Sequence, residues 1–345
     1  MPKVDLATNA TLVQRYANPQ NGGKILVVSH EWPDGDAVGS AVAMWHLLNK
    51  NGYEADLYLP DVLPDYYRSF LPYCRVVPKS DSINIDYTLL VCVDASNEKR
   101  IDLGEVNIHQ LTIPIVIFDH HPDADEYFGI GSCIMPEASS ASEIIWKYAK
   151  MQKWQWDEYA ATSLLLGIIT DTGCFRFSNT TPDTMRAAAD LLEAGADQER
   201  IIREIYFSKP RNLLFFENEL FHNIKFAYDG KFAWVNVTRE LLDKYSVNLK
   251  ETEQLIEVIR SIKDVVVAAI IKPTSNPSIF KVSLRSKDKT ISVGRIARAL
   301  KGGGHEMAAG CSIIAKTKEY AEQALCRNVR RELFHENLTE KNHHE

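Results

Sequence analysis

The stretch SHEWPDGDAVGS, residues 29–40, places one imidazole and two carboxylates within seven residues, directly after the apolar run 24–28. The three side chains are His30, Asp34 and Asp36. Imidazole nitrogens and carboxylate oxygens bind divalent metal ions and carry out acid–base chemistry. A short loop of this composition after a buried strand is therefore a candidate metal or acid–base site.

The same residue types follow three other apolar segments. They are Asp94 after YTLLVCV (87–93), Asp119, His120 and His121 after IPIVIF (113–118), and Asp171 after the helical SLLLGIIT (163–170). In open α/β sheets the functional crevice lies at the carboxyl ends of the strands, so we expect all eight groups to converge. A single Asp after a strand is more often a turn residue or a helix N-cap, and a single histidine is more often structural. Together at one edge without a metal, however, the eight groups would repel one another, and the joint pattern favours a metal centre.

The donor set indicates the kind of metal. Carboxylate oxygen and imidazole nitrogen without a nearby thiolate suit Mn²⁺, Mg²⁺, Fe or Co better than a closed structural zinc site. Two ions about 3.5–4 Å apart are typical of phosphoester hydrolysis, because the pair generates hydroxide and holds the attacking and leaving oxygens. The carboxylates and imidazoles present suffice for two open sites if one carboxylate bridges.

The elements that must position these groups alternate between strands and helices. The runs 24–28, 55–59, 87–93 and 113–118 predict strands, and helical spacing predicts a helix at 37–52. This order predicts an α/β fold with a parallel sheet covered by helices on both faces. Further predicted helices lie at 139–152, 157–170 and 182–195.

The second half of the chain repeats a smaller strand and helix pattern after a charged connector at 197–212. Strands are predicted near 222–228, 231–237, 265–271, 279–285 and 311–315, with helices near 251–262, at 293–301 and through 332. We therefore expect a catalytic metal-binding domain at 1–195, a linker at 196–215 and a smaller α/β substrate-binding domain at 216–345.

Composition limits the class of protein. With 345 residues, 45 % hydrophobic and 25 % charged, the chain is an ordinary globular protein long enough for two domains. No apolar run approaches the ~20 residues that span a bilayer, and no apolar signal core is present, so we expect no membrane association and a cytoplasmic protein. Six cysteines without a CxxC pair fit free thiols in a reducing cytosol. The net charge of −7 argues against binding to long duplex nucleic acid.

A basic strip interrupts this acidic average. Residues 272–301 carry eight Lys and Arg side chains against the single acid Asp288, and Gly302, Gly303, Gly304 and His305 follow. Glycines without side chains let backbone N–H groups approach a phosphate or base closely. The combination predicts a module that holds an anionic substrate.

Five motifs together resemble the signatures of the DHH/DHHA1 phosphoesterase family. They are HEWPDGDAVGS, the Asp of VCVD, the DHH triplet, TDTGCF and GGGHEMAAG, and they span about residues 24–315. Within that family the chain is most similar to the stand-alone nanoRNase and pAp phosphatase group. Relatives often have four glycines before the histidine, whereas this chain has Lys301 in the first position.

The resemblance implies a role for each candidate residue. It implies that His30 and Asp34 hold one Mn²⁺, that Asp36, His120 and Asp171 hold a second, and that Asp94 bridges both, with Mg²⁺ or Co²⁺ as alternative ions. It also implies that His121 faces the scissile phosphate, that Asp119 orients a histidine, and that Arg285, His305 and the glycines Gly302, Gly303 and Gly304 hold the distal end of the substrate.

The implied activity is hydrolysis of short single-stranded RNA to nucleoside monophosphates and of 3′-phosphoadenosine 5′-phosphate to AMP. Alternatives within the family are a cyclic-di-AMP or pApA phosphodiesterase and a pyro- or exopolyphosphatase. The alternative that is not an enzyme is a nucleotide-binding regulator. The intact ligand set disfavours it, because a protein that only binds nucleotides does not need six metal ligands. The sequence leaves open whether the protein forms a homodimer.

Overall fold

The buried apolar runs of the first half form a five-stranded parallel sheet in the computed structural model. The structure describes residues 3–59, 63, 65–71, 87–104, 106, 108, 111–121, 128–252 and 255–335. Contacts divide the chain into two units, Met1–Ser208 and Lys209–Glu345. The predicted α/β class is confirmed, with a parallel sheet in the first unit and a mixed sheet in the second.

The sheet of the first unit has the strand order β2-β1-β3-β4-β5, and every neighbouring pair is parallel. The strands are β1 (Lys24–Val28), β2 (Glu54–Tyr58), β3 (Leu89–Val93), β4 (Ile115–Asp119) and β5 (Gly131–Ile134). The first four fall within a residue or two of their predicted positions. The fifth was not predicted, because GSCI is short and begins with glycine.

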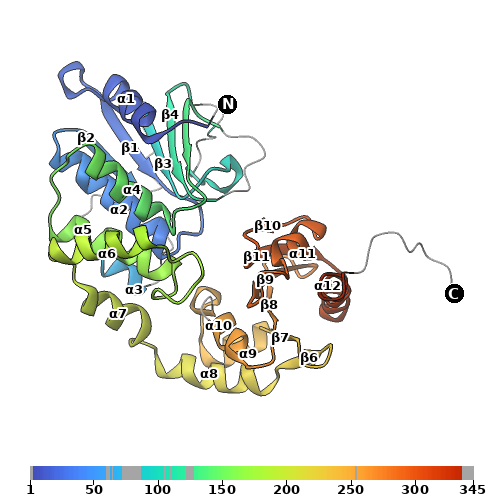
Figure 1. Cartoon of the computed structure of the whole chain (residues 1–345). Helices are drawn as coiled ribbons and strands as arrows, with labels where there is room; N and C mark the ends of the chain where they lie inside the picture. The colour runs from blue at the N-terminus through green and yellow to red at the C-terminus, as the bar shows by residue number, and fades with distance from the viewer. Residues whose placement is uncertain are drawn as a thin grey trace. The chain divides into compact units, whose positions relative to one another are not determined.

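Helices cover one face of this sheet (Figure 1). The helices of this unit are α1 (Leu6–Tyr16), α2 (Gly35–Lys50), α3 (Asp65–Arg68), α4 (Ala141–Met151), α5 (Glu158–Asp171), α6 (Pro182–Glu193) and α7 (Gln198–Tyr206). Of these, α1, α2 and α4 pack on the sheet, whereas α5 packs against α2 and α4, and α6 and α7 pack against α5. Short 3₁₀ turns lie at Pro19–Asn21 and Glu98–Arg100. Ile25 and Val27 of β1 face the helical layer, whereas Leu26 and Val28 point to the opposite face, as expected for alternating side chains.

The opposite face differs from the expectation of helices on both sides. In the described part of the chain it is packed by side chains of the connection between β3 and β4, among them Leu103 and Ile108, and by Tyr58 and Tyr87. The sheet remains buried on both faces because irregular segments can supply apolar side chains as well as helices do.

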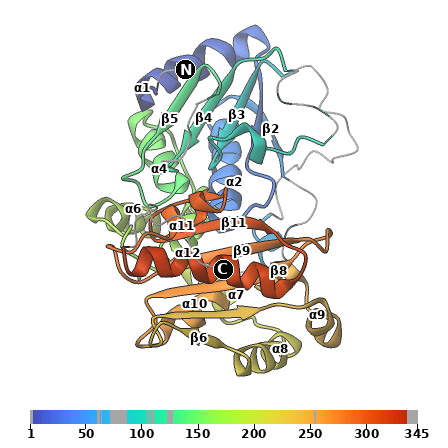
Figure 2. The ribbon, with the colours of Figure 1, turned by 90° about the vertical axis from the view of Figure 1, so that its right-hand side faces the viewer.

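The second unit has a six-stranded mixed sheet of order β10-β11-β9-β8-β7-β6, in which β7 and β8 are parallel and the other pairs antiparallel. Its strands are β6 (Lys225–Ala227), β7 (Phe232–Asn236), β8 (Val267–Pro273), β9 (Ile279–Ser286), β10 (Gly303–Gly304) and β11 (Ala308–Ile314). Its helices are α8 (Arg211–His222), α9 (Arg239–Tyr245), α10 (Leu255–Ser261), α11 (Val293–Ala299) and α12 (Lys318–Leu333), with a 3₁₀ turn at Leu249–Thr252. One face packs against α11 and α12, which Figure 2 shows running along the sheet, and the other packs against α8, α9 and α10.

The charged segment expected as a linker, 196–215, contains α7 and the beginning of α8. Ile201 and Ile205 of α7 are buried in the core of the first unit. Their spacing of four residues places both on one face of the helix, and the charged residues occupy the other. This part of the segment is therefore packed against the first unit.

Two sequence expectations concern chemistry outside the site. No helix in the described ranges is both long and apolar enough to cross a bilayer. The cysteines that the structure describes are free thiols, namely Cys92, Cys133, Cys174, Cys311 and Cys326. Cys74 lies outside the described residues.

Candidate metal centre

The candidate ligands meet at the carboxyl edge of the parallel sheet. The strand order makes β1 the point where the chain turns from one side of the sheet to the other, and the crevice at such a point is the usual ligand site of this architecture. His30 lies two residues beyond β1, Asp94 directly follows β3, and Asp119 ends β4 with His120 next.

The start of α2 delivers two further carboxylates. Asp34 is the N-cap of α2, and its side chain accepts hydrogen bonds from the backbone N–H groups of Asp36 at 3.0 Å and Ala37 at 3.1 Å. A side chain at Gly35 would place its Cβ 2.4 Å from the Thr170 side chain, so glycine allows α2 to begin against the end of α5. This close approach brings Asp36 next to Asp171, which ends α5.

Asp36 is buried and held by the start of a third helix. Its Oδ2 accepts from the N–H of Ala141 at 2.6 Å, and its Oδ1 accepts from the N–H of Ser142 at 3.0 Å. The N-terminus of α4 thus presents free N–H groups and the positive end of its dipole to a carboxylate. A Cβ at Gly167 would lie 2.5 Å from Asp36 Oδ1, so this glycine lets α5 pass beside Asp36 and the start of α4.

Asp94 lies between His30 and His120 and is 2 % exposed. Its Oδ2 is 3.4 Å from His30 Nε2, and its Oδ1 is 3.6 Å from His120 Nε2. The two oxygens of one carboxylate therefore face two different imidazoles. The backbone of Asp94 has a φ of 55°, in the left-handed region where Asp and Asn are the best tolerated side chains after glycine.

His120 faces three carboxylates. Its Nε2 is 3.6 Å from Asp94, 3.7 Å from Asp171 Oδ2 and 4.0 Å from Asp36 Oδ2. Asn179 Nδ2 donates to the backbone carbonyl of Asp171 at 3.2 Å and lies 3.5 Å from its Oδ2. One imidazole and three carboxylates from four separate segments thus lie close together.

His121 is oriented by the residue two positions before it. Asp119 Oδ1 accepts from the N–H groups of His120 at 2.8 Å and of His121 at 3.2 Å, and it lies 2.7 Å from His121 Nδ1. Asp119 is fully buried. The contact with Nδ1 fixes the ring of His121, so that Nε2 lies on the side away from Asp119.

Burial and neighbouring charges shift the pKa values of the clustered carboxylates in different directions. Burial, followed by repulsion from Asp94 and Asp171, raises the pKa of Asp36 well above its usual range. Burial raises the pKa of Asp171 to about 6. Burial would also raise the pKa of Asp94, but its contacts with His120 and His30 outweigh that effect and hold the pKa well below its usual range. Such divergent pKa values mark carboxylates crowded into one buried space, which a bound cation would stabilise.

The residues fit a pair of divalent cations. Potential ligand atoms of His30, Asp34 and Asp94 lie within 4.8 Å of one another, and the same holds for Asp36, His120 and Asp171. Both ring nitrogens of His30 and the Oδ1 of Asp94 are buried without a hydrogen-bond partner. Buried polar atoms normally have partners, and metal coordination would satisfy these.

The candidate substrate residues lie together within the second unit. Arg285 is on β9, opposite Ala308 at the start of β11, and His305 lies between β10 and β11. The guanidinium of Arg285 donates to Glu257 at 3.2 Å and to the Leu284 carbonyl at 3.1 Å. These residues therefore cluster at one end of the second sheet, and an acid holds the arginine in place.

The three consecutive glycines at 302–304 differ in what they accommodate. A Cβ at Gly302 would lie 2.2 Å from the Gly310 carbonyl oxygen, and one at Gly304 would lie 2.7 Å from the Ala309 Cα. A Cβ at Gly303 would meet nothing within 4 Å. Packing against β11 explains the first and last glycine, whereas Gly303 faces open space. Lys301 has a φ of 61°, in the left-handed region that favours glycine.

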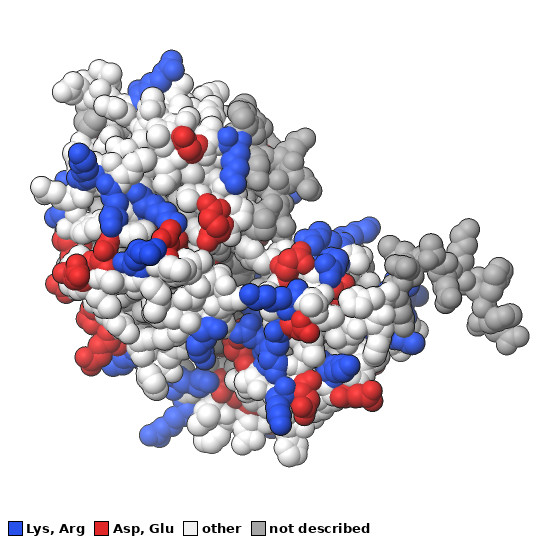
Figure 3. All heavy atoms as spheres, in the orientation of Figure 1, with Lys and Arg blue, Asp and Glu red and all other residues white. Residues whose placement is uncertain are grey.

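The basic strip is not a uniform positive surface. Three of its arginines contact glutamates: Arg285 with Glu257 at 3.2 Å, Arg295 with Glu332 at 2.5 Å, and Arg298 with Glu306 at 2.9 Å. Lys272 is buried. Figure 3 shows basic and acidic side chains interspersed on the face that it displays. Half of the eight cations of the strip are therefore paired or buried.

Sequence reasoning missed the residues that support the ligands. Asn179 contacts Asp171, and Glu143 accepts from Ser139 beside the start of α4. The stretch SSASE at 139–143 carries a signal, since Ser140 and Glu143 match the spacing of a capping box before an apolar run. This pattern indicates a helix start alone, because the side chains that the segment supports lie far away in the sequence.

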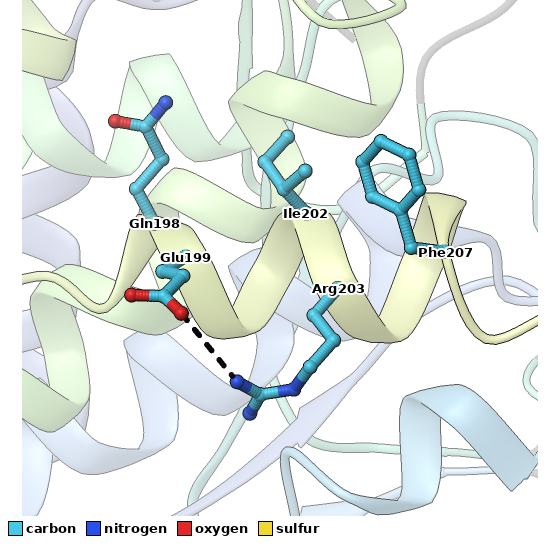
Figure 4. A pocket seen from close by; sticks show the side chains of 5 residues that line it. All are labelled: Gln198, Glu199, Ile202, Arg203 and Phe207. Carbon is cyan, nitrogen blue, oxygen red and sulfur yellow. Dashed lines mark ion pairs between the residues drawn. The ribbon is translucent and has the colours of Figure 1, made fainter.

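A hollow along α7 offers different chemistry. Gln198, Glu199, Ile202, Arg203 and Phe207 line it, as Figure 4 shows, and all come from this one helix and its C-terminal cap. Its charged groups are an ion pair 3.9 Å apart between Glu199 and Arg203. An exposed pair of this kind is weak, so the hollow lacks the buried charges of the metal centre.

Two family models match the chain. The model of the DHH family, N-terminal domain, covers residues 24–168, and that of the DHHA1 domain covers residues 230–331. The first match contains all candidate ligands except Asp171, and the second contains Arg285 and the glycines.

Curated proteins and a solved structure resemble the chain over most of its length. It is 29 % identical over 313 residues to the bifunctional oligoribonuclease and PAP phosphatase NrnA of Thermus thermophilus, covering 90 % of each chain. It is 28 % identical over 292 residues to the protein of the same name from Bacillus subtilis, covering 84 % of this chain and 89 % of that one. A crystal structure of an exopolyphosphatase-related protein from Bacteroides fragilis has a TM-score of 0.84 at 23 % identity, covering 98 % of this chain and 100 % of that one. This last likeness bears on the fold alone.

Proposed function

Because the chain belongs to the DHH/DHHA1 phosphoesterase family, we propose that it is a metal-dependent hydrolase that cleaves short oligoribonucleotides to nucleoside monophosphates and dephosphorylates 3′-phosphoadenosine 5′-phosphate to AMP. The oligoribonuclease and PAP phosphatase activities are those named for its curated relatives. We propose that it acts in the cytoplasm, where thiols stay reduced, since the cysteines in the described residues are free.

The observation that carries this proposal is the position of Asp94 between two ligand groups. One of its oxygens faces His30 at 3.4 Å and the other faces His120 at 3.6 Å. A carboxylate that presents separate oxygens to two neighbouring positions is suited to bridge two cations. A dinuclear centre is the usual device for displacement at phosphorus.

Each ligand group would then hold one ion. His30 and Asp34 would bind the first, Asp36, His120 and Asp171 the second, and Asp94 both. Mn²⁺ suits this mixture of carboxylate and imidazole donors, and Mg²⁺ or Co²⁺ are the alternatives. Bound there, the ions supply a water of lowered pKa as nucleophile and positive charge for the phosphate oxygens.

The remaining residues of the site position the substrate. Asp119 holds His121 through Nδ1 at 2.7 Å, and we propose that Nε2 of His121 contacts an oxygen of the scissile phosphate. A fixed ring of this kind costs no reorganisation when charge develops on the phosphate.

The second unit supports the choice of short substrates. Arg285, Gly303 and His305 would hold the end of the substrate away from the scissile bond, with Gly303 as the glycine whose missing side chain leaves room. Long nucleic acids bind through many phosphate contacts on a basic surface. The three arginines of the basic strip are paired with glutamates, which leaves fewer cations for such contacts.

A substrate panel tests the proposal. The purified protein with Mn²⁺ is given 3′-phosphoadenosine 5′-phosphate, RNAs of two to five nucleotides, pApA, cyclic-di-AMP and pyrophosphate in parallel. We expect the short RNAs and 3′-phosphoadenosine 5′-phosphate to be hydrolysed fastest. Faster turnover of cyclic-di-AMP, pApA or pyrophosphate would assign one of the other activities, and binding without turnover would indicate a regulator.

A further inference from the structure

Glu143 is a buried acid that belongs to neither ligand group. It lies on α4 and is 0 % exposed. Its Oε2 accepts from the Ser139 N–H at 3.1 Å, from Ser139 Oγ at 2.7 Å and from Thr184 Oγ1 at 2.8 Å. Its Oε1 lies 2.9 Å from Lys147 Nζ. A buried carboxylate costs free energy unless such partners surround it. Glu143 therefore holds Ser139, Thr184 and Lys147 in place around it.

The segment that Glu143 holds is the one that binds Asp36. Ser140 caps α4 by accepting from the Glu143 N–H at 3.1 Å. The next two N–H groups, of Ala141 and Ser142, donate to the Asp36 carboxylate at 2.6 and 3.0 Å. The orientation of the Asp36 carboxylate therefore depends on how the start of α4 is fixed.

The same segment also reaches Asp171. The Ser139 carbonyl accepts from Asn179 Nδ2 at 2.9 Å, and that nitrogen also contacts the Asp171 carbonyl at 3.2 Å. Two of the three side chains around His120 are thus tied to residues 139–142. The first ligand group has other supports, since Asp34 caps α2 and His30 follows β1.

We propose that Glu143 is a positioning residue for one of the two metal sites. Through Ser139 and Thr184 it fixes the start of α4, and it thereby aligns Asp36 and, by way of Asn179, Asp171, without itself touching metal or substrate. This inference rests on the proposed dinuclear centre and assigns unequal dependence on Glu143 to its two sites. Partners of ligating side chains elsewhere contribute about 10- to 100-fold to metal affinity.

A purely structural role is the competing explanation, because Glu143 also joins α4 to α6. The chain offers a matched control at the other end of α4. Asp190 of α6 accepts from Trp146 Nε1 at 3.2 Å and contacts Lys150 Nζ at 2.6 Å. Asp190→Asn weakens the contact between the same two helices without touching residues 139–142.

The experiment is calorimetric titration of metal-free protein with Mn²⁺, together with the melting temperature of each variant. We expect the wild-type protein and Asp190→Asn to bind two equivalents with the same affinities. We expect Glu143→Gln to bind one equivalent as the wild-type protein does and the second about 10- to 100-fold more weakly. Unchanged binding of both equivalents by Glu143→Gln, or equal weakening of both, overturns the inference.

A second pair of variants tests the same inference if the Glu143→Gln protein does not fold. Thr184→Val removes the hydroxyl that donates to Glu143, and Thr184→Ser keeps it. We expect Thr184→Val to weaken one equivalent selectively and Thr184→Ser to restore it, whereas equal metal binding by both overturns the inference. A wild-type protein that binds fewer than two equivalents overturns the dinuclear centre itself, which separates failure of the proposed function from failure of this inference alone.

Discussion

The two units hold their polar residues in opposite ways. In the first unit His30, Asp94 and Asp119 are between 0 % and 3 % exposed, and some of their polar atoms lack a hydrogen-bond partner. In the second unit the Arg285 side chain is 29 % exposed and paired with Glu257. A bound cation would satisfy the unpartnered atoms of the first unit, whereas Arg285 of the second already has an acidic partner.

This difference assigns different consequences to mutation. We expect removal of a proposed ligand from the first unit to dismantle the metal centre, because no neighbouring group can replace a buried donor. We expect removal of a cation from the second unit to weaken the proposed hold on one part of a substrate. Effects on all substrates are therefore expected from the first unit, and effects that depend on the substrate from the second.

The largest effect is expected from Asp94→Asn. Asparagine tolerates the left-handed backbone at this position but removes the charge that both ligand groups share. We expect both metal equivalents to be lost and hydrolysis of every substrate to fall by roughly a thousandfold or more, since metal stabilisation of a phosphoryl transition state amounts to several kcal/mol. Metal analysis of the purified variant gives the stoichiometry.

His30→Ala is the comparison for this variant, because His30 belongs to one ligand group only. It should lose mainly one equivalent. Two equivalents retained by Asp94→Asn would contradict the bridging role.

Arg285→Ala is expected to reduce kcat/KM on dinucleotides by roughly ten- to a hundredfold, because a charge-assisted hydrogen bond contributes about 1.5–3 kcal/mol. Bis-p-nitrophenyl phosphate is too short to need a distal contact and should be cleaved nearly as well as by the wild-type protein. Equal losses on both substrates, in a folded and fully metallated variant, would mean that Arg285 acts at the reacting phosphate.

Gly302→Ala and Gly303→Ala separate packing from substrate binding within one loop. The Cβ at position 302 would lie 2.2 Å from the Gly310 carbonyl oxygen, so we expect a loss of about 1–3 kcal/mol of stability. Gly303→Ala should leave the melting temperature unchanged and raise KM for dinucleotides. Thermal melts and kinetics on the same samples test the pair, and a destabilised Gly303→Ala would show that this glycine is structural too.

The smallest effect is expected from Asp157→Asn, an ion-pair variant in the first unit away from the metal centre. Asp157 caps α5 and contacts His46 and Lys50 at 3.0 and 2.9 Å. Burial would raise the pKa of this carboxyl, but His46 and Lys50 outweigh burial and lower it. Asparagine keeps the cap, and the carboxylate is partly exposed, so we expect a loss of about 0.3–1 kcal/mol at pH 7.

The pH dependence of that loss follows from the lowered pKa. A carboxyl with a lowered pKa in the folded state stabilises the protein above its unfolded pKa of about 3.9 and loses this contribution as the pH falls. Urea unfolding at several pH values should show the difference between wild type and Asp157→Asn shrinking below pH 4. A constant difference, or any loss of metal, would contradict the account.

The sequence was informative where local pattern decides structure. Apolar runs followed by Asp94 or Asp119 marked strand ends, and parallel strands must bring those ends to one edge. Asp34 shows that a structural and a functional role can coexist in one residue, since it caps α2 and also lies in a ligand group.

Long-range contacts account for what the sequence could not indicate. Asp36 is held by residues more than a hundred positions away in the sequence. Glu143 accepts a hydrogen bond from Thr184, which lies 41 residues further along the chain. The amphipathic helix α7 was obscured by charge, because only two of its side chains, those of Ile201 and Ile205, are buried. Arg285 was expected to hold the substrate, and no local signal shows that Glu257 of α10 pairs with it.

The most direct test of the division between the two units is a comparison of RNA lengths under metal control. The kcat/KM values for a 3-mer and a 24-mer RNA, at matched concentrations of ends, are measured for metal-free protein and after addition of two equivalents of Mn²⁺. The account predicts no hydrolysis without metal, and with metal faster turnover of the 3-mer than of the 24-mer. Hydrolysis by the metal-free protein, or turnover of the 24-mer at least as fast as that of the 3-mer, would contradict it.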